Sequence, residues 1–186
     1  MPPQQPDGLL DIVDDGLNFR AHANDSVRFA AVNLMFLLHD HKAKQMREHL
    51  IGTWKLVSVA NEDAATGERS ELFGPDPIGY INYAPDGRMM VIQVRSDRRK
   101  PAGSIATAAE AEALFKSLLS YAGTYVVEGD QVTHRVDISW NESWTGTTQK
   151  RTFRIEGDHL HLSMPASPNP VDGRMGVRSV IWRKVS

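Results

Sequence analysis

The chain has 186 residues, and its apolar fraction of 41% and charged fraction of 24% are typical of a soluble globular protein long enough to bury a core. A net charge of −2, with Lys and Arg spread along the chain, gives no electrostatic reason to expect a nucleic-acid partner. The absence of cysteine excludes disulfides, thiolate metal sites and cysteine nucleophiles, and it favours a cytoplasmic location.

The N-terminal region is predicted to be an extension outside the main domain. Residues 1–25 are rich in Pro, Gln and Asp and lack the basic start and apolar run of a signal peptide. Residues 25–48 predict one helix, because polar residues at its start can cap it and basic residues gather near its end. We therefore expect an extension over residues 1–48 and a second domain over residues 49–186.

The front half of this helix is too apolar to remain in water. Val27, Leu34 and Leu38 are its predicted contact residues, since burying a large apolar side chain stabilises by about 1.5–3 kcal/mol. The helix can pack on the main domain, form a homodimer contact, close over a cavity as a lid, or lie on a membrane surface. Its apolar stretch is shorter than the roughly 20 residues that span a bilayer, so no stable membrane insertion is expected.

After Gly52 the hydrophobic pattern changes to the period of two that is typical of β-strands. Turn-forming residues separate the apolar runs, among them Asp86-Gly87 and Gly129-Asp130. Trp54 follows the tight turn at Gly52 and is large enough to plug one end of a closed sheet. Strands are predicted over residues 52–60, 68–73, 78–84, 88–95, 122–128, 131–140, 147–156, 159–164 and 177–184.

One helix interrupts these strands. Thr107 and Glu110 have the spacing of a capping box, and apolar residues follow at helical intervals as far as Leu118 and Leu119. The expected fold class is therefore all-β: an antiparallel barrel of about 8–10 strands with one inserted helix and the extra N-terminal helix.

Alternation along two strands places polar side chains inside this barrel. In residues 131–140 the apolar positions share a face with His134, and in residues 147–156 they share a face with Gln149 and Arg151. A buried polar group costs about 1–3 kcal/mol when unpaired, so these groups must bond to each other, to water or to a ligand. The apolar residues that mark the two inner faces are Val132, Val136, Ile138, Trp140, Phe153 and Ile155.

His134 and Arg151 are predicted to be neighbours. Burial and the adjacent cation should lower the pKa of His134, which leaves a neutral imidazole able to move a proton. Arg151 would keep its charge for a carboxylate or enolate oxygen of a ligand. Each has a structural alternative, His134 as a hydrogen-bonded core residue and Arg151 as a strut to backbone carbonyls. Alanine at either position is predicted to abolish ligand response without unfolding the barrel.

Seven motifs in chain order resemble the compact bacterial and fungal lipocalin-like domain family, and together they cover residues 50–184. They are Gly52–Ser58, Pro77–Tyr83, Pro85–Met89, Tyr121–Tyr125, Gly129–His134, Trp144–Gly146 with Gln149 and Arg151, and Ile181–Arg183. The resemblance implies a lipocalin-like barrel around a small-molecule cavity, and it does not fix an activity.

Two functions follow as hypotheses. In the first, the cavity binds a small apolar or amphipathic metabolite whose polar end is held by His134 and Arg151. In the second, the same cavity belongs to a cofactor-independent isomerase, cyclase or lyase that acts on a carbonyl-bearing small molecule by acid–base chemistry. A third reading is an assembly module that uses the N-terminal helix. The predicted catalytic residues are His134, Arg151 and Tyr125, and the predicted ligand-binding residues are Tyr80, Tyr83, Gln149, Trp144, Met89 and Phe153.

No cofactor or metal site is predicted. His159 and His161 share one face of a strand, as a metal-binding pair would, but that face is the outer one and no third ligand lies nearby in the sequence. The chain also lacks a phosphate-binding loop and a nucleophile elbow.

Overall fold

The computed structural model describes residues 9–14, 17–22, 25–168 and 175–185, and the chain forms two compact units, Met1–Lys42 and Ala43–Ser186. The first unit holds an antiparallel hairpin of β1 (Leu9–Asp14) and β2 (Leu17–His22), followed by the start of α1 (Asp25–Leu50). The sequence pattern does not predict this hairpin, since the Pro, Gln and Asp content of the region outweighs its short apolar runs.

The helix α1 begins where the sequence predicts and ends two residues later, at Leu50. Leu34 and Leu38 are 55% and 58% exposed in the single chain, while the side chain of Val27 lies outside the described residues. The contact that would cover these side chains therefore stays a prediction.

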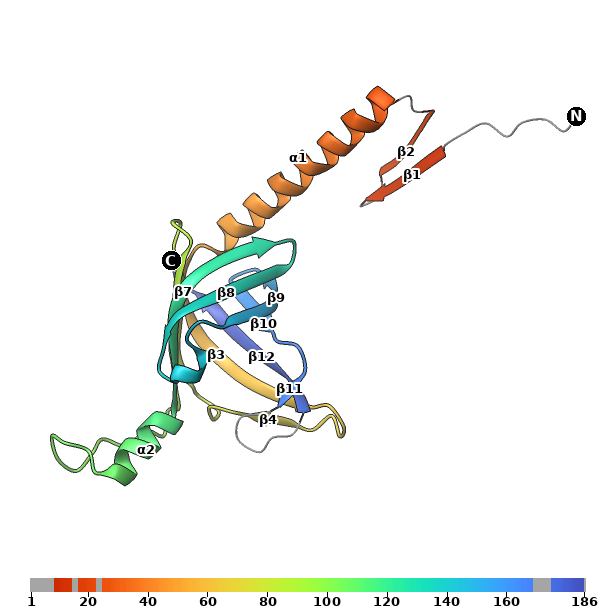
Figure 1. The fold of residues 1–186 in the computed structure, drawn as a ribbon. Helices are drawn as coiled ribbons and strands as arrows, with labels where there is room; N and C mark the ends of the chain where they lie inside the picture. Colours follow the sequence, from red (N-terminus) through yellow and green to blue (C-terminus); the bar gives the residue numbers. More distant parts are fainter. Residues whose placement is uncertain (1–8, 15–16, 23–24, 169–174, 186) are drawn as a thin grey trace, which may run out of the picture. The chain divides into compact units, whose positions relative to one another are not determined.

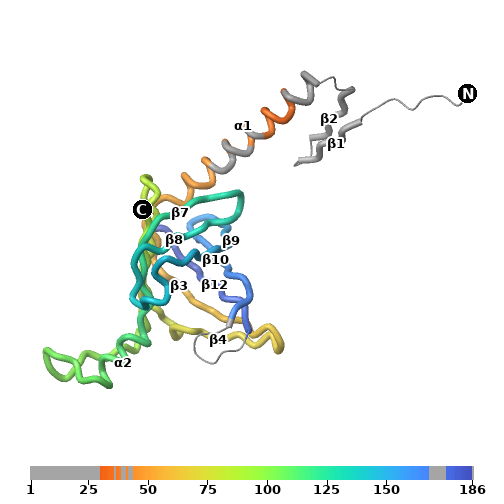
Figure 2. Tube along the Cα trace, viewed as in Figure 1, coloured from red at the N-terminus to blue at the C-terminus, as the bar shows by residue number. Residues whose placement is uncertain are grey.

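In the second unit, eight antiparallel strands close into a barrel (Figure 1). The ring is closed by the pairing of the first strand, β3, with the last, β12, which lie side by side (Figure 2). Two short strands, β4 (Arg69–Glu71) and β11 (Ser167–Pro168), extend the sheet beside β3 and β12. Around the ring the strands are β3 (Gly52–Asp63), β5 (Ile78–Tyr83), β6 (Arg88–Val94), β7 (Leu118–Glu128), β8 (Gln131–Ser139), β9 (Thr148–Glu156), β10 (His159–Ser163) and β12 (Met175–Lys184).

The all-β antiparallel barrel is thus confirmed, and the main difference lies at the inserted helix. Helix α2 (Ala108–Lys116) has the predicted capping box between Thr107 and Glu110, but it ends before Leu118. Leu118 and Leu119 instead begin β7, where they pair with Val94 and Gln93 of β6. The helical spacing of these leucines was therefore misleading, because the same residues also fit a strand that β6 extends.

One end of the barrel is packed shut, as the sequence predicts for Trp54. This side chain is 1% exposed, and its indole N–H donates to the Leu50 carbonyl at 2.9 Å. The ammonium of Lys184 lies 4.3 Å from the centre of the indole, which adds a cation–π contact. This bond therefore links Leu50, the last residue of α1, to the first strand of the barrel.

A β-bulge changes which residues of β8 face inwards. Gly123 pairs with Val136 and Ala122 pairs with Ile138, so Asp137 is an extra residue that reverses the alternation. Ile138 is 64% exposed in consequence, and its predicted place on the inner face is wrong.

Gly123 permits the close approach of strands at this bulge, and Gly123→Ala is expected to destabilise the barrel by about 1–3 kcal/mol. An added Cβ would lie 1.9 Å from the backbone oxygen of Arg135, which cannot move without breaking the β7–β8 pairing. Urea denaturation measures the loss. Gly103→Ala, whose nearest neighbour would be 3.9 Å away, is the control, and equal stability of both variants would contradict the prediction.

Candidate functional site

Beyond the packed end, the barrel holds a cavity of about 1480 Å³. Helix α2, which lies at one end of the barrel (Figure 1), and the chain around Arg95–Lys100 contribute to its lining, so the cavity extends to that end. Apolar side chains make up much of the lining, including Val59, Leu72, Phe73, Leu119, Trp144 and Val180. Polar and charged residues line it as well, among them Gln93, Tyr121, Gln149, Arg151 and Arg178.

Arg151 on β9 and Tyr121 on β7 meet at the inner part of this cavity. Arg151 is 8% exposed, and its guanidinium donates to the Tyr121 hydroxyl at 3.4 Å and to the Lys150 carbonyl at 3.1 Å. Within the described residues it forms no ion pair with a carboxylate. The backbone contact agrees with the strut alternative, yet the charge itself is left uncompensated.

His134 lies behind this pair and is fully buried. Its Nε2 is 2.8 Å from the Tyr83 hydroxyl and its Nδ1 is 2.8 Å from the Tyr121 hydroxyl. Burial, and then the charge of Arg151, hold the pKa of His134 well below its usual value near 6.5, so the imidazole is neutral. Burial also raises the pKa of both tyrosines, which therefore keep their protons at neutral pH.

The hydrogen-bond partners determine which nitrogen of His134 carries the proton. Among the described residues, the buried Tyr83 hydroxyl has His134 as its hydrogen-bond partner, so its O–H donates to Nε2. The proton of the neutral ring then resides on Nδ1 and is donated to the Tyr121 oxygen. That oxygen already accepts from Arg151, so the O–H of Tyr121 is free to donate into the cavity.

The sequence-predicted site residues fall into two groups. Gln149 and Trp144 line the cavity, as does Arg151. The remaining inward-facing residues are buried in the packed core and are not among those that line the cavity: His134, Tyr83, Met89 and Phe153.

Two tyrosine predictions need correction. Tyr80 is 46% exposed on the outer face of β5, because the inner positions of that strand are Ile81 and Tyr83. Tyr125 does face inwards, but its hydroxyl donates to the Ala84 carbonyl at 2.9 Å rather than to His134 or Arg151. Tyr121 is the tyrosine whose hydroxyl contacts both His134 and Arg151.

Among the polar residues of the cavity, the sequence-based prediction missed Gln93, Tyr121 and Arg178. A usable signal was present for each. Tyr121 lies two residues before Gly123 and four before Tyr125, Gln93 follows Met89 and Val91 on alternate positions of β6, and Arg178 precedes Val180 and Trp182.

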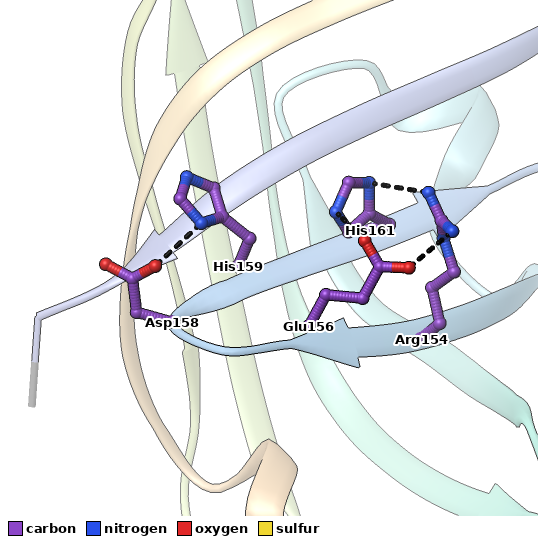
Figure 3. Close-up of polar contacts among 5 residues, drawn as sticks. All are labelled: Arg154, Glu156, Asp158, His159 and His161. Atoms are coloured by element: carbon purple, nitrogen blue, oxygen red, sulfur yellow. Dashed lines mark hydrogen bonds and ion pairs between the residues drawn. The ribbon is translucent and has the colours of Figure 1, made fainter.

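The two outward-facing histidines of β10, His159 and His161, contact different carboxylates (Figure 3). His159 pairs with Asp158 at 2.7 Å, while His161 lies 3.4 Å from Glu156, which also pairs with Arg154. Within the described part of the chain, no three side chains of the metal-binding types come together.

The sequence profile of the lipocalin-like domain matches residues 51–185. The chain belongs to the lipocalin-like domain family. A crystal structure of a lipocalin-like protein from Bacteroides uniformis is similar at 16% identity and a TM-score of 0.40, and the match covers 73% of this chain and 98% of that one. No curated protein matches this sequence. None of the described helices of this lipocalin-like protein is long and apolar enough to cross a membrane.

Proposed function

We propose that the lipocalin-like barrel binds a small amphipathic metabolite, with its apolar body in the cavity and its polar end at Arg151 and Tyr121. A ligand-binding barrel is what the family's fold supports in general. The observation that carries the proposed binding mode is the lining of the cavity. It includes many apolar side chains, and it contains a buried guanidinium, that of Arg151, which has no carboxylate partner among the described residues. A ligand's polar group would satisfy that cation and the free O–H of Tyr121 together.

Binding is better supported than acid–base turnover. An isomerase or lyase needs a base that reaches the ligand, and both ring nitrogens of His134 are occupied by tyrosine hydroxyls. Tyr121 can donate a proton or a hydrogen bond into the cavity, whereas Gln149 and Arg151 cannot accept a proton at neutral pH. The role proposed for His134 is therefore to orient Tyr121, and direct contact with the ligand is left to Tyr121 and Arg151.

We also propose that the protein is cytoplasmic and that it forms a homodimer. The lack of cysteine favours the reducing cytoplasm. The exposed Leu34 and Leu38 of α1 favour a homodimer contact through this helix.

The cavity is tested with N-phenyl-1-naphthylamine, a neutral probe whose fluorescence rises when it leaves water. We expect the wild-type protein to bind it, and the Leu119→Trp variant to bind it at least about ten-fold more weakly. The added indole of this variant would fill part of the cavity that Leu119 lines.

A matched control uses a second, apolar depression on the outer face of the barrel, lined in part by Tyr80, Met90, Ile92 and Ile138. Ile92→Trp adds an indole to the outer face of the β6–β7 strand pair, to which Leu119 also belongs, and should leave probe binding unchanged. If Ile92→Trp weakens binding and Leu119→Trp does not, the probe binds outside and the proposed function is wrong. Thermal unfolding of both variants shows that they remain folded.

A further inference from the structure

Arg178 is a second guanidinium that reaches the cavity from the opposite side of β10. It lies on the inner face of β12 with Val180 and Trp182, and it lines the cavity. Its Nη2 donates to the Ser167 hydroxyl at 2.8 Å, while its Nε is buried and has no hydrogen-bond partner among the described residues. A buried N–H without an acceptor is costly, so a ligand atom that accepts from it would be stabilising.

Arg151 and Arg178 lie at the same level of the barrel. Strand β10 separates β9 from β12, and Ser163 of β10 pairs with Thr152 on one side and Ser179 on the other. One residue further along, Met164 donates its backbone N–H to the Arg178 carbonyl at 2.9 Å. Two strand spacings amount to about 10 Å, so side chains from these positions can approach one group from two sides.

Within the described residues, no acidic group neutralises the charge of either guanidinium. No described carboxylate forms an ion pair with Arg151 or Arg178. Burial, and then the like charge of Arg151, lower the pKa of Arg178, since two neighbouring cations repel each other. An anion placed between them would relieve this repulsion.

The wall and mouth of the cavity carry the same sign of charge. Eight basic residues and two acidic ones line it, although the whole chain has a net charge of −2. One of the acidic residues, Asp97, already pairs with Arg95 at 2.7 Å. A cleft lined by one sign of charge raises the local concentration of ligands of the opposite sign.

We propose that the ligand of this cavity is an apolar acid, whose anionic headgroup is held between Arg151 and Arg178 and accepts a hydrogen bond from Tyr121. This inference rests on the proposed function and names its ligand class. The apolar wall accommodates a hydrocarbon body, and the two guanidinium groups supply the charge-assisted hydrogen bonds that a carboxylate prefers.

The test compares compounds that share a twelve-carbon chain and differ in their headgroups, each measured by displacement of N-phenyl-1-naphthylamine. We expect dodecanoate to bind at least about ten-fold more tightly than 2-dodecanone or methyl dodecanoate, and the preference to decrease as salt is added. Dodecyl phosphate is included to distinguish a phosphate headgroup from a carboxylate. If the neutral compounds bind as tightly as dodecanoate, the anion proposal is wrong while binding of the neutral probe still supports the cavity.

Arg178→Gln is the decisive variant. It should weaken dodecanoate about ten-fold and leave the neutral probe and 2-dodecanone within about two-fold, whereas Arg178→Lys should restore part of the preference. Arg183→Gln, an exposed residue of the same strand, is the matched control and should change nothing. An unchanged preference for dodecanoate in a folded Arg178→Gln protein would overturn the proposed role of Arg178.

Discussion

The His134→Ala variant is expected to be about 4 kcal/mol less stable than the wild-type barrel at neutral pH. The substitution removes the acceptor of the Tyr83 hydroxyl and a donor to the Tyr121 hydroxyl, both of which lie 2.8 Å from the ring. The unpaired Tyr83 hydroxyl costs about 1–3 kcal/mol, the Tyr121 oxygen keeps only the bond from Arg151, and removal of the ring adds a void between the two tyrosines. The sequence-based prediction of an intact barrel in this variant therefore needs revision, since lost stability would accompany lost binding.

Urea denaturation of single and double variants measures this effect. His134→Ala combined with Tyr83→Phe should cost less than the sum of the two single changes, because no unpaired Tyr83 hydroxyl remains. Tyr125→Phe is the control, since the hydroxyl of Tyr125 bonds to the Ala84 carbonyl instead of His134. A loss below about 1 kcal/mol for His134→Ala would show that the tyrosine–histidine network contributes little.

The positions of His134 and Arg151 could be predicted from the sequence because alternation is regular along that part of each strand. From Val132 to Val136 every second residue is buried, and along β9 every second residue is buried or partly buried. The same rule fails at Ile138, because the bulge at Asp137 adds one residue that no hydrophobic pattern announces. Period-two reasoning is therefore dependable only within an uninterrupted ladder.

Tyr121 and Arg178 were missed because each lies near a strand start that the sequence predicts poorly. The helical spacing of Leu118 and Leu119 concealed the first residues of β7, and the expected start of the last strand at residue 177 left Arg178 near a loop. The hydrophobic pattern of a single strand also cannot predict which part of the interior is packed and which part is a cavity. It depends on which side chains from eight strands meet at one level, as Arg151 and Arg178 do.

Acidification from about pH 6.5 to about pH 5 is expected to lower the free energy of unfolding by about 2 kcal/mol through His134 alone. The folded pKa of His134 lies well below 6.5, so in this range the unfolded chain takes up a proton more readily than the folded chain does. The stabilisation is therefore complete above the unfolded pKa and is lost as the pH falls, by about 1.4 kcal/mol per pH unit. The two tyrosines that face the ring add no titration here, because burial raises the pKa of Tyr83 and of Tyr121 and both stay neutral.

Urea denaturation at several pH values tests this linkage, with His134→Gln as the comparison. As the pH falls, the free energy of unfolding of the variant should decrease less steeply than that of the wild type, by the equivalent of one bound proton. This difference in slope does not depend on the lower starting stability of the variant. The carboxyls of Asp97, Glu110 and Glu112, whose pKa values are lowered from 3.8 or 4.5, titrate below this window. Nitrogen-15 NMR of the folded protein gives a second readout, in which His134 should remain the neutral Nδ1–H tautomer down to about pH 5. Protonation of the folded-state ring near pH 6.5, with equal slopes for wild type and variant, would show that Arg151 and burial do not keep it neutral.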